Sequence, residues 1–544
     1  MPTSEAGSAP GLVRALARAG RLARGLARWT GDLALALAGA VLLAAHLRSD
    51  ALLPLSYVGL VPWVWLWGIR ERRAGWGTFV AAAGTYWVLY HTFLASYAWW
   101  VPVAMVFVYG LPFLPFAFLL RIARRSRLPW TIVVPVAWVS TEWIFAHLAL
   151  GRVADMLLGY AQAPILSLIQ VADVGSVYLV SFIVAMVNGA IADVIAARAW
   201  SPVVLWRSRA RWPLAAAAGI LVAANLYGLL RLRSLHLEPG PRIGVVQPAV
   251  DHTGYNTFTV YGPTVALTAR TWDAPGKVDL IVWPENSIQD YLDRFGVYEE
   301  DLKWLARRAG APLLVGSYGR HPQAPAVSTN TVTLAGPAGL STERYDKIRL
   351  MPWMEYVPFT PFLAAVAPDL ARYHARLTAA IIGYATTGSS EFRGRRVTVF
   401  DWPGLPRFSA LICFETMDPT LAREAVVGGA RVLVNPTSEG LVGTRLQLQM
   451  LRIAALRAVE TRVPVVRAGN MGISGYIAPD GRIQSIVRGQ QRGSVVFDPG
   501  VATQRVMLAA GSASPYARFG DLFVFAVLAS AVAGVAYAAT RRPA

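Results

Sequence analysis

The sequence predicts a chain with two kinds of structure: a polytopic α-helical membrane domain of about eight spans and an α/β layered soluble domain. Composition supports the membrane part. Of the 544 residues, 55% are hydrophobic and only 15% are charged, against about 25% charged in a typical soluble domain. The soluble part shows a different pattern. Between residues 238 and 505, short β-rich runs alternate with helical stretches, as is typical of layered α/β domains.

Eight apolar runs approach or exceed the roughly 20 residues that a helix needs to cross a bilayer. They lie at 31–47, 51–69, 75–97, 100–120, 130–150, 174–197, 213–230 and 519–540. The predicted domains are therefore a basic segment (1–30), a seven-span membrane domain (31–237), a soluble domain (238–505) and a final span with its tail (506–544).

The placement of arginine predicts the orientation of the spans. The chain has three lysines and 48 arginines, and 18 of the arginines lie on alternate loops, while the opposite loops hold few. Because positively charged loops stay on the cytoplasmic side, both termini are predicted to be cytoplasmic and the soluble domain to lie on the other side. The 18 are Arg14, Arg18, Arg21, Arg24, Arg28, Arg70, Arg72, Arg73, Arg121, Arg124, Arg125, Arg127, Arg198, Arg207, Arg209, Arg211, Arg541 and Arg542.

The net charge of +19 is attributed to this topology, not to nucleic acid binding, because the arginines flank apolar segments. Arginines at helical spacing between residues 11 and 29 predict an amphipathic helix on the cytoplasmic membrane surface. A disordered basic tail is the alternative interpretation of the same residues.

Five buried strands and three helices are predicted in the soluble domain. The strands are RIGVVQ (242–247), VDLIVWPE (278–285), PLLVGSY (312–318), FSALICFE (408–415) and RVLVNPT (431–437), and the helices are 299–310, 418–430 and 448–462. At about 270 residues, the domain is large enough for one substantial core.

Three groups capable of chemistry lie at predicted strand ends, where the active groups of α/β sheets gather. They are Glu285, Lys347 and Cys413, which is the only cysteine of the chain. A thiol can attack a carbonyl carbon when a carboxylate takes its proton. A lysine can stabilise the developing oxyanion or lower the thiol pKa. A single cysteine excludes an intramolecular disulfide framework and a cysteine-cluster metal site.

Each of the three also has a purely structural interpretation. Cys413 fits a small buried hydrophobe, Glu285 a partner of a helix N-terminus, and Lys347 a surface residue. Spacings of 62 and 66 residues between them do not decide the matter. Only the combination of the three favours a catalytic site.

The segments WPEN, DKIRLMPWMEYVPF and ICFE, in this order, resemble the nitrilase superfamily, whose triad is Glu-Lys-Cys. Seven spans before such a domain and one after it resemble the apolipoprotein N-acyltransferase family. STEW (140–143), LGYAQ (158–162) and ETRVPVVRAGNMGISGYIAPDG (460–481) agree with it. The resemblance covers about residues 31 to 540 and implies a nitrilase-like α-β-β-α sandwich for the soluble domain.

The resemblance also implies a reaction at the periplasmic face of the inner membrane. Cys413 would take an acyl chain from the sn-1 ester of a phospholipid as a thioester and pass it to the N-terminal α-amine of a diacylglyceryl-cysteine apolipoprotein. Glu285 would act as base and acid. Lys347 and the Phe414 backbone N–H would stabilise the oxyanion, and Glu355 and Glu415 match supporting positions. No metal, diffusible cofactor or nucleic acid is implied.

The sequence departs from the family near Asp251, at Ser438 and Glu439, at Met450, and at Phe414, where Tyr is common. These positions are expected around the substrate entrance and bear on acceptor specificity. Two other functions stay open: a membrane-anchored carbon–nitrogen hydrolase (amidase), and a non-catalytic paralogue that binds lipoproteins. A transporter is disfavoured, because the spans hold few charges beyond Glu142 and Asp173.

Overall fold

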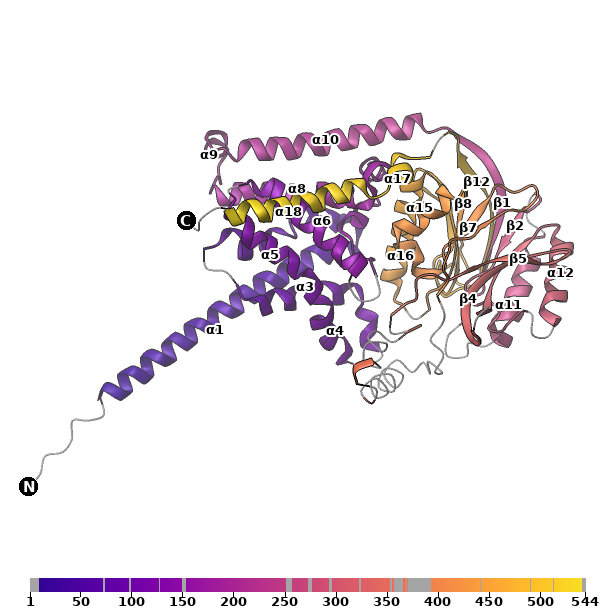
Figure 1. Ribbon diagram of the computed structural model, residues 1–544, viewed down its shortest axis with the longest axis horizontal. Helices are drawn as coiled ribbons and strands as arrows, with labels where there is room; N and C mark the ends of the chain where they lie inside the picture. Colours follow the sequence, from indigo (N-terminus) through magenta and orange to yellow (C-terminus); the bar gives the residue numbers. More distant parts are fainter. Residues whose placement is uncertain are drawn as a thin grey trace, which may run out of the picture.

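A helical domain and a pair of β-sheets lie side by side in the computed structural model (Figure 1). The structure describes residues 9–71, 74–96, 99–126, 128–148, 153–250, 257–272, 276–292, 296–321, 324–352, 355–356, 365–367, 369, 393–440, 442–489, 491–511 and 513–540. Asp251 and the C-terminal pair Arg541 and Arg542 lie outside these residues.

Seven helical segments in the described part of the chain are long and apolar enough to cross a membrane. They correspond to seven of the eight predicted runs. They are Ala17–Leu47 within α1 (Ala9–Ala44) and η1 (Ala45–Leu47), Asp50–Ile69, Val101–Ala123 across α4 and α5, α6 (Trp130–Leu148), α8 (Ala172–Ala196), α10 (Arg211–Ser234) and α18 (Leu522–Thr540).

The eighth predicted run, 75–97, does not form a single described helix of the length of the other seven. It forms α3 (Trp76–Tyr90), which has 15 residues, followed by the short turn η4 (Thr92–Ser96). A Cβ added at Gly84 of α3 would lie 1.9 Å from the Val106 carbonyl oxygen of α4 (Val101–Gly110). Glycine at this position lets the backbones of α3 and α4 approach closely.

The basic N-terminal segment is continuous with the first span. Helix α1 runs for 36 residues without a break at residue 30, and its first part extends away from the helical domain (Figure 1). Leu22, Leu26 and Trp29 are exposed there, beside exposed arginines. These exposed apolar and basic side chains are consistent with the predicted amphipathic helix. Its location on the membrane surface stays a prediction.

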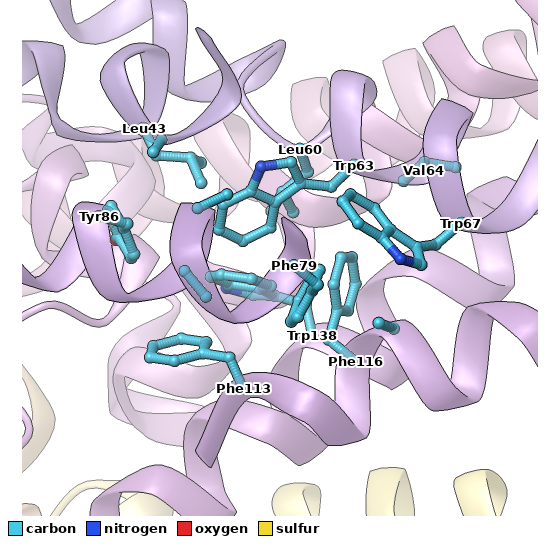
Figure 2. Packing of buried hydrophobic residues seen from close by; sticks show 14 of the residues in the cluster. Leu43, Leu60, Trp63, Val64, Trp67, Phe79, Tyr86, Phe113, Phe116 and Trp138 are labelled. Carbon is cyan, nitrogen blue, oxygen red and sulfur yellow. The ribbon is translucent and has the colours of Figure 1, made fainter. Parts of the chain in front are cut away.

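Aromatic side chains form the core of the helical domain (Figure 2). Trp63, Trp67, Phe79 and Phe116 are fully buried, and the ring centroids of Trp67 and Phe79 are 5.0 Å apart in an edge-to-face arrangement. The indole of Trp63 donates a 2.8 Å hydrogen bond to the Ala36 carbonyl. Aromatic pairs and the Trp63 hydrogen bond therefore help to hold α1, α3 and α5 (Leu114–Ala123) together.

The soluble domain is the predicted α-β-β-α sandwich. Its two sheets have the strand orders β12-β1-β2-β3-β4-β5 and β11-β10-β9-β8-β7-β6, each six-stranded. The strands are β1 (Leu237–Gln247), β2 (Leu280–Val282), β3 (Leu313–His321), β4 (Ala324–Gly336), β5 (Gly339–Asp346), β6 (Val399–Phe400), β7 (Phe408–Ala410), β8 (Val432–Ser438), β9 (Val465–Asn470), β10 (Gly475–Ile477), β11 (Ile483–Ile486) and β12 (Gly500–Ala509).

Apolar side chains from both sheets meet in the middle of the sandwich, among them Val282, Leu314, Val434 and Val466. Helices α11 (Thr257–Ala269) and α12 (Val297–Ala309) cover the outer face of one sheet. Helices α15 (Pro419–Val427) and α16 (Thr444–Thr461) cover the other. Each helix buries one apolar face against a sheet, which is the standard arrangement for layered domains.

The five predicted strands and three predicted helices are present with shifted ends. The shift that matters for the site concerns 408–415, where the strand ends at Ala410 and residues Cys413–Met417 form a 3-10 turn, η9. The hairpin β4–β5 and the strands β6 and β9 to β12 were not predicted as separate elements. Polar residues and glycine interrupt most of their apolar runs, and continuous apolar runs are the signal on which the five predictions relied.

Candidate active site

Glu285 and Lys347 follow two strands of one sheet, β2 and β5, that run in the same direction. Strands β2 and β3 pair in parallel, and β4 and β5 each reverse direction, so β5 ends at the same edge of the sheet as β2. Glu285 lies three residues beyond β2 and Lys347 directly follows β5. The parallel order of the sheet therefore brings together two groups that are 62 residues apart.

Lys347 lies between two carboxylates. Its Nζ donates to Glu285 Oε1 at 2.8 Å and to Glu355 Oε1 at 2.6 Å, and only 1% of its side chain is exposed. Burial alone would lower the lysine pKa, but the charges of Glu285 and Glu355 outweigh it and raise the pKa well above its usual value. Lys347 therefore stays positively charged, and the predicted surface role is wrong.

Cys413 occupies a strained backbone position after β7. Its φ is +56°, a region that residues other than glycine rarely adopt, and it begins the η9 turn. Asn435 of β8 holds this turn: its Nδ2 donates to the carbonyls of Leu411 at 2.5 Å and of Cys413 at 2.9 Å. The turn projects Cys413 beyond the sheet edge, and its side chain is only half-buried.

The electrostatics of the site act on the thiol from both sides. Burial raises the pKa of Cys413, and the negative charge of Glu285 raises it further, while Lys347 and the Thr437 hydroxyl lower it. The raised pKa means that the resting group is a neutral thiol. A thiolate therefore forms only when a neighbouring group accepts the proton, and Glu285 is a carboxylate close enough to influence the thiol.

Glu415 joins the loop of Lys347 to the turn of Cys413. Its Oε1 accepts the backbone N–H groups of Ile348 at 2.7 Å and Arg349 at 2.9 Å. Its Oε2 accepts from the Ile412 N–H at 2.7 Å and the Tyr345 hydroxyl at 2.8 Å. Burial raises the pKa of Glu415 to about 7 against the lowering effect of these donors. One carboxylate thus connects the chain on both sides of the site.

The other two predicted supporting residues also lie at the site. Glu355 Oε2 accepts the Met351 N–H at 2.7 Å, which closes the loop that carries both residues. The Phe414 ring is buried, with its centroid 5.3 Å from Lys347 Nζ, a cation–π geometry. Phe414 N is among the first amides of the η9 turn, which have no acceptor inside the turn. All six predicted site residues are therefore brought together.

Two contacts of Glu285 were missed by sequence reasoning. Asn330 of β4 donates from Nδ2 to Glu285 Oε1 at 2.7 Å and to Glu355 Oε1 at 3.3 Å. The backbone N–H of Ser438 donates to Glu285 Oε2 at 2.9 Å. A backbone donor leaves no side-chain signature at position 438. Asn330 lies in a strand that was itself not predicted, so neither contact had a usable signal.

Glu439 and Met450, predicted to lie around the substrate entrance, are both buried, and their position relative to an entrance stays a prediction. Glu439 Oε1 accepts from Arg467 Nη2, and Arg467 Nη1 donates to Asn435 Oδ1 at 2.6 Å. Glu439, which departs from the family pattern, therefore forms a buried ion pair with Arg467, and Arg467 bonds the Asn435 side chain that holds the Cys413 turn. Met450 packs in the apolar cluster between α16 and the helical domain.

No group of three or more metal-binding side chains occurs among the residues that the structure describes. The arrangement supports three chemical roles: nucleophilic attack by the thiol, proton transfer by the carboxylate and stabilisation of an oxyanion by the ammonium.

Comparison with known proteins places both domains in one family. Residues 38–190 match the apolipoprotein N-acyltransferase N-terminal domain, and residues 242–498 match the carbon-nitrogen hydrolase family. An apolipoprotein N-acyltransferase of Geobacter metallireducens is 30% identical over 530 residues, which cover 94% of this chain and 96% of that protein. One from Agrobacterium fabrum is 28% identical over 75% of each chain.

Solved structures similar to the soluble domain include an amidase from Nesterenkonia sp. AN1. It is 17% identical, with a TM-score of 0.36, over 53% of this chain and 98% of that one. A nitrilase-superfamily member from Saccharomyces cerevisiae is 15% identical, with a TM-score of 0.37, over 49% of this chain and 91% of that one. The near full-length match to the Geobacter protein, together with both domain matches, shows that this chain belongs to the apolipoprotein N-acyltransferase family of the nitrilase superfamily.

Proposed function

We propose that Cys413, Glu285 and Lys347 catalyse acyl transfer from a membrane phospholipid to the N-terminal amine of a diacylglyceryl apolipoprotein. The observation that carries this assignment is the buried Glu285–Lys347 ion pair, with 2.8 Å between Nζ and Oε1, acting on the only cysteine of the chain. A purely structural cysteine needs neither a strained turn nor a flanking base and cation.

In the first step, Glu285 takes the thiol proton as sulfur attacks the carbonyl carbon of the sn-1 ester. Lys347 and the Phe414 N–H stabilise the resulting oxyanion. When the intermediate collapses, the bond between the carbonyl carbon and the glycerol oxygen breaks. Glu285 returns the proton to that oxygen, which releases a lysophospholipid and leaves the acyl chain on Cys413 as a thioester.

In the second step, the α-amine of the apolipoprotein attacks the thioester carbonyl and gives a proton to Glu285. The carbon–sulfur bond breaks, an amide forms, and the thiolate regains its proton from Glu285. Both substrates are anchored in the bilayer, so a site held at the membrane surface keeps them close. Such positioning supplies several kcal/mol of the barrier.

We also propose that the catalytic domain is periplasmic and that both termini are cytoplasmic. The start of α10, the end of α18 and the start of α1 all lie on the side of the helical domain away from the sheets (Figure 1). Arg211 at that end of α10 stacks on Trp206 and Trp212, 5.4 and 5.0 Å from their ring centroids. Aromatic and basic residues at one end of a span are typical of a cytoplasmic membrane interface.

The experiment is an acyl-transfer assay with a phospholipid carrying a fluorescent sn-1 chain and a diacylated lipopeptide. We expect label on the protein first, no label on Cys413→Ala, and transfer to the peptide when it is added. Label released only as free fatty acid would contradict acyl transfer and favour a hydrolase. A wild-type protein that never takes up label would favour a lipoprotein-binding paralogue.

A further inference from the structure

Two sequence motifs of the helical domain, STEW and LGYAQ, are joined by hydrogen bonds. These bonds have no part in the proposed reaction. Glu142 of STEW accepts hydrogen bonds on Oε1 from Trp138 Nε1 at 2.8 Å and from the Leu158 N–H at 2.6 Å. Leu158 begins the 3-10 turn η7 (Leu158–Gln162), which is the LGYAQ motif. The next amide, of Gly159, donates to Ser181 Oγ of α8 at 2.8 Å. STEW and α8 therefore fix the position of Tyr160.

Tyr160 reaches from this turn to the catalytic domain. Its hydroxyl lies 3.5 Å from the carbonyl oxygen of Met417, the last residue of the turn that begins at Cys413. Arg457 of α16 donates from Nη1 to the same carbonyl at 3.3 Å, and its guanidinium carbon lies 5.7 Å from the Tyr160 ring centroid. The far end of the catalytic turn thus rests on Arg457 and Tyr160.

Arg457 is fully buried, and its charge is balanced by Glu460, with 2.7 Å between Nη2 and Oε1. Glu460 Oε1 also accepts from Ser176 Oγ at 2.7 Å and from the Val177 N–H at 2.8 Å. Ser176 lies where α8 departs from helical geometry, with φ of +58°. The ion pair is therefore bonded to the membrane domain on one side and to the catalytic turn on the other.

Apolar packing at the same place joins the two domains. Phe414 and Met417 of the turn are buried in one cluster with Leu157, Tyr160 and Val177 of the helical domain. A buried ion pair inside such a cluster is weak support for stability, because well-packed apolar residues serve as well or better. Stability alone therefore does not explain why a buried ion pair lies here. Fixing the geometry of the η9 turn does explain it.

We propose that Arg457 is a positioning residue: it holds the Met417 carbonyl against the membrane domain, so that the Cys413 thiol faces Glu285 and Lys347. This inference rests on the proposed role of Cys413 as the nucleophile. The helical domain then does more than anchor the enzyme, since Tyr160 and Ser176 complete the support of the turn. A displacement of the thiol by about 1 Å is enough to lower the rate about 100-fold.

The test compares Arg457→Lys with Arg462→Lys in the full-length protein. Lysine keeps the charge but has a single ammonium, which cannot serve both the Met417 carbonyl and Glu460 as the guanidinium fork does. Arg462 is a matched control: it is buried at the same interface, 2.6 Å from Asp173, and its hydrogen bonds within the described part of the chain go to Asp173, Gln170 and Pro479 instead of the η9 turn. Tyr160→Phe, which removes one hydroxyl, is the milder second variant.

For each folded variant, we would measure the single-turnover rate of acyl-enzyme formation from the fluorescent phospholipid, its dependence on phospholipid concentration, and the melting temperature. We expect Arg457→Lys to lower the maximal rate about ten- to 100-fold while the half-saturating concentration changes less than about twofold. Arg462→Lys should retain the wild-type rate even where its melting temperature falls. Tyr160→Phe should lower the rate in the same direction by a smaller factor.

A purely structural role predicts a different result, in which the rate per folded molecule follows the melting temperature in both arginine variants alike. That result would overturn the inference, as would a wild-type rate in Arg457→Lys. If Arg457→Lys fails to fold, an unchanged rate in Tyr160→Phe overturns it. Failure of the wild-type protein to form acyl-enzyme would instead overturn the proposed function, so the two outcomes are distinguishable.

Discussion

Lys347 donates a 2.8 Å hydrogen bond to Glu285 at a place where both side chains are buried. Glu355 accepts a second bond from the same ammonium, so one positive charge serves two carboxylates. In the proposed reaction, proton transfer at Glu285 would take place beside a fixed cation, and the oxyanion would meet a charge that is already in position.

Removing this cation should be costly for stability as well as for activity. Lys347→Met leaves Glu285 and Glu355 without their ammonium, and loss of one partner of a buried pair typically lowers the free energy of unfolding by about 3–5 kcal/mol. Loss of an oxyanion donor should lower the acylation rate by at least about 100-fold. Denaturation and single-turnover assays measure the two effects.

Lys303→Met is the control for that change. Lys303 pairs with Glu299 and Glu300 on the surface of α12, at 3.2 and 2.8 Å. Exposed pairs contribute little to stability. Equal losses in the two variants would contradict the importance assigned to the buried pair.

Glu285→Gln should make the thiol more reactive toward a simple alkylating reagent while abolishing acyl transfer. The charge of Glu285 raises the pKa of Cys413, and Lys347 lowers it. Removing the carboxylate therefore lowers the thiol pKa and increases the thiolate fraction at pH 8, about tenfold for each pKa unit. Because the chain has one cysteine, iodoacetamide labelling followed by mass spectrometry reports on Cys413 alone.

The matched control is Glu424→Gln, which removes an exposed carboxylate on α15. It should leave the alkylation rate unchanged. Slower alkylation in Glu285→Gln than in the wild-type protein would contradict this prediction, because it would mean that loss of the proton acceptor outweighs removal of the negative charge.

Tyr345→Phe should shift the acidic side of the pH–rate profile for acylation to higher pH. Four donors favour ionised Glu415, including the Tyr345 hydroxyl at 2.8 Å, yet burial raises its pKa to about 7. Loss of the hydroxyl raises that pKa further, so the carboxylate that holds the Lys347 loop is protonated at a higher pH. A pH–rate profile measures the shift, and Tyr476→Phe, a buried hydroxyl bonded to the Ile243 and Ala502 carbonyls, should not produce it.

The same carboxylate also predicts how stability depends on pH. The pKa of Glu415 in the folded state lies above the ordinary value near 4.5, so between pH 4.5 and about 7 the folded protein binds more protons at this site than the unfolded chain. The contribution of Glu415 to the free energy of unfolding therefore decreases as pH rises through that window. Urea denaturation at several pH values should show a steeper decrease in Tyr345→Phe than in Tyr476→Phe.

The proposed orientation predicts which introduced cysteines a membrane-impermeant maleimide can label in intact cells with a permeabilised outer membrane. In a Cys413→Ser background, Val297→Cys at the exposed start of α12 should be labelled. Trp206→Cys, exposed in α9 (Pro202–Arg207), should be labelled only after the inner membrane is broken. The reverse pattern would overturn the orientation inferred from arginine placement.

Much of this architecture could be predicted from the sequence, because the signals for it are local. Apolar length marks the spans, and arginine asymmetry predicts their orientation. Short apolar runs located the strands that precede Glu285 and Cys413. The run at 75–97 was predicted from the same signal, whereas the close contact of Gly84 in α3 with Val106 in α4 leaves no trace in composition.

The sequence by itself, with the family resemblance of its motifs, predicted the two kinds of domain and the six candidate site residues. Only the tertiary structure decided how they meet: the Lys347 bridge between Glu285 and Glu355, the Asn330 and Ser438 donors, and the support of the Cys413 turn by Arg457 and Tyr160. The physical reason is distance along the chain. Glu285 and Ser438 are 153 residues apart and Tyr160 and Met417 are 257 apart, so sheet order and domain packing, not local propensity, bring their atoms within hydrogen-bonding distance.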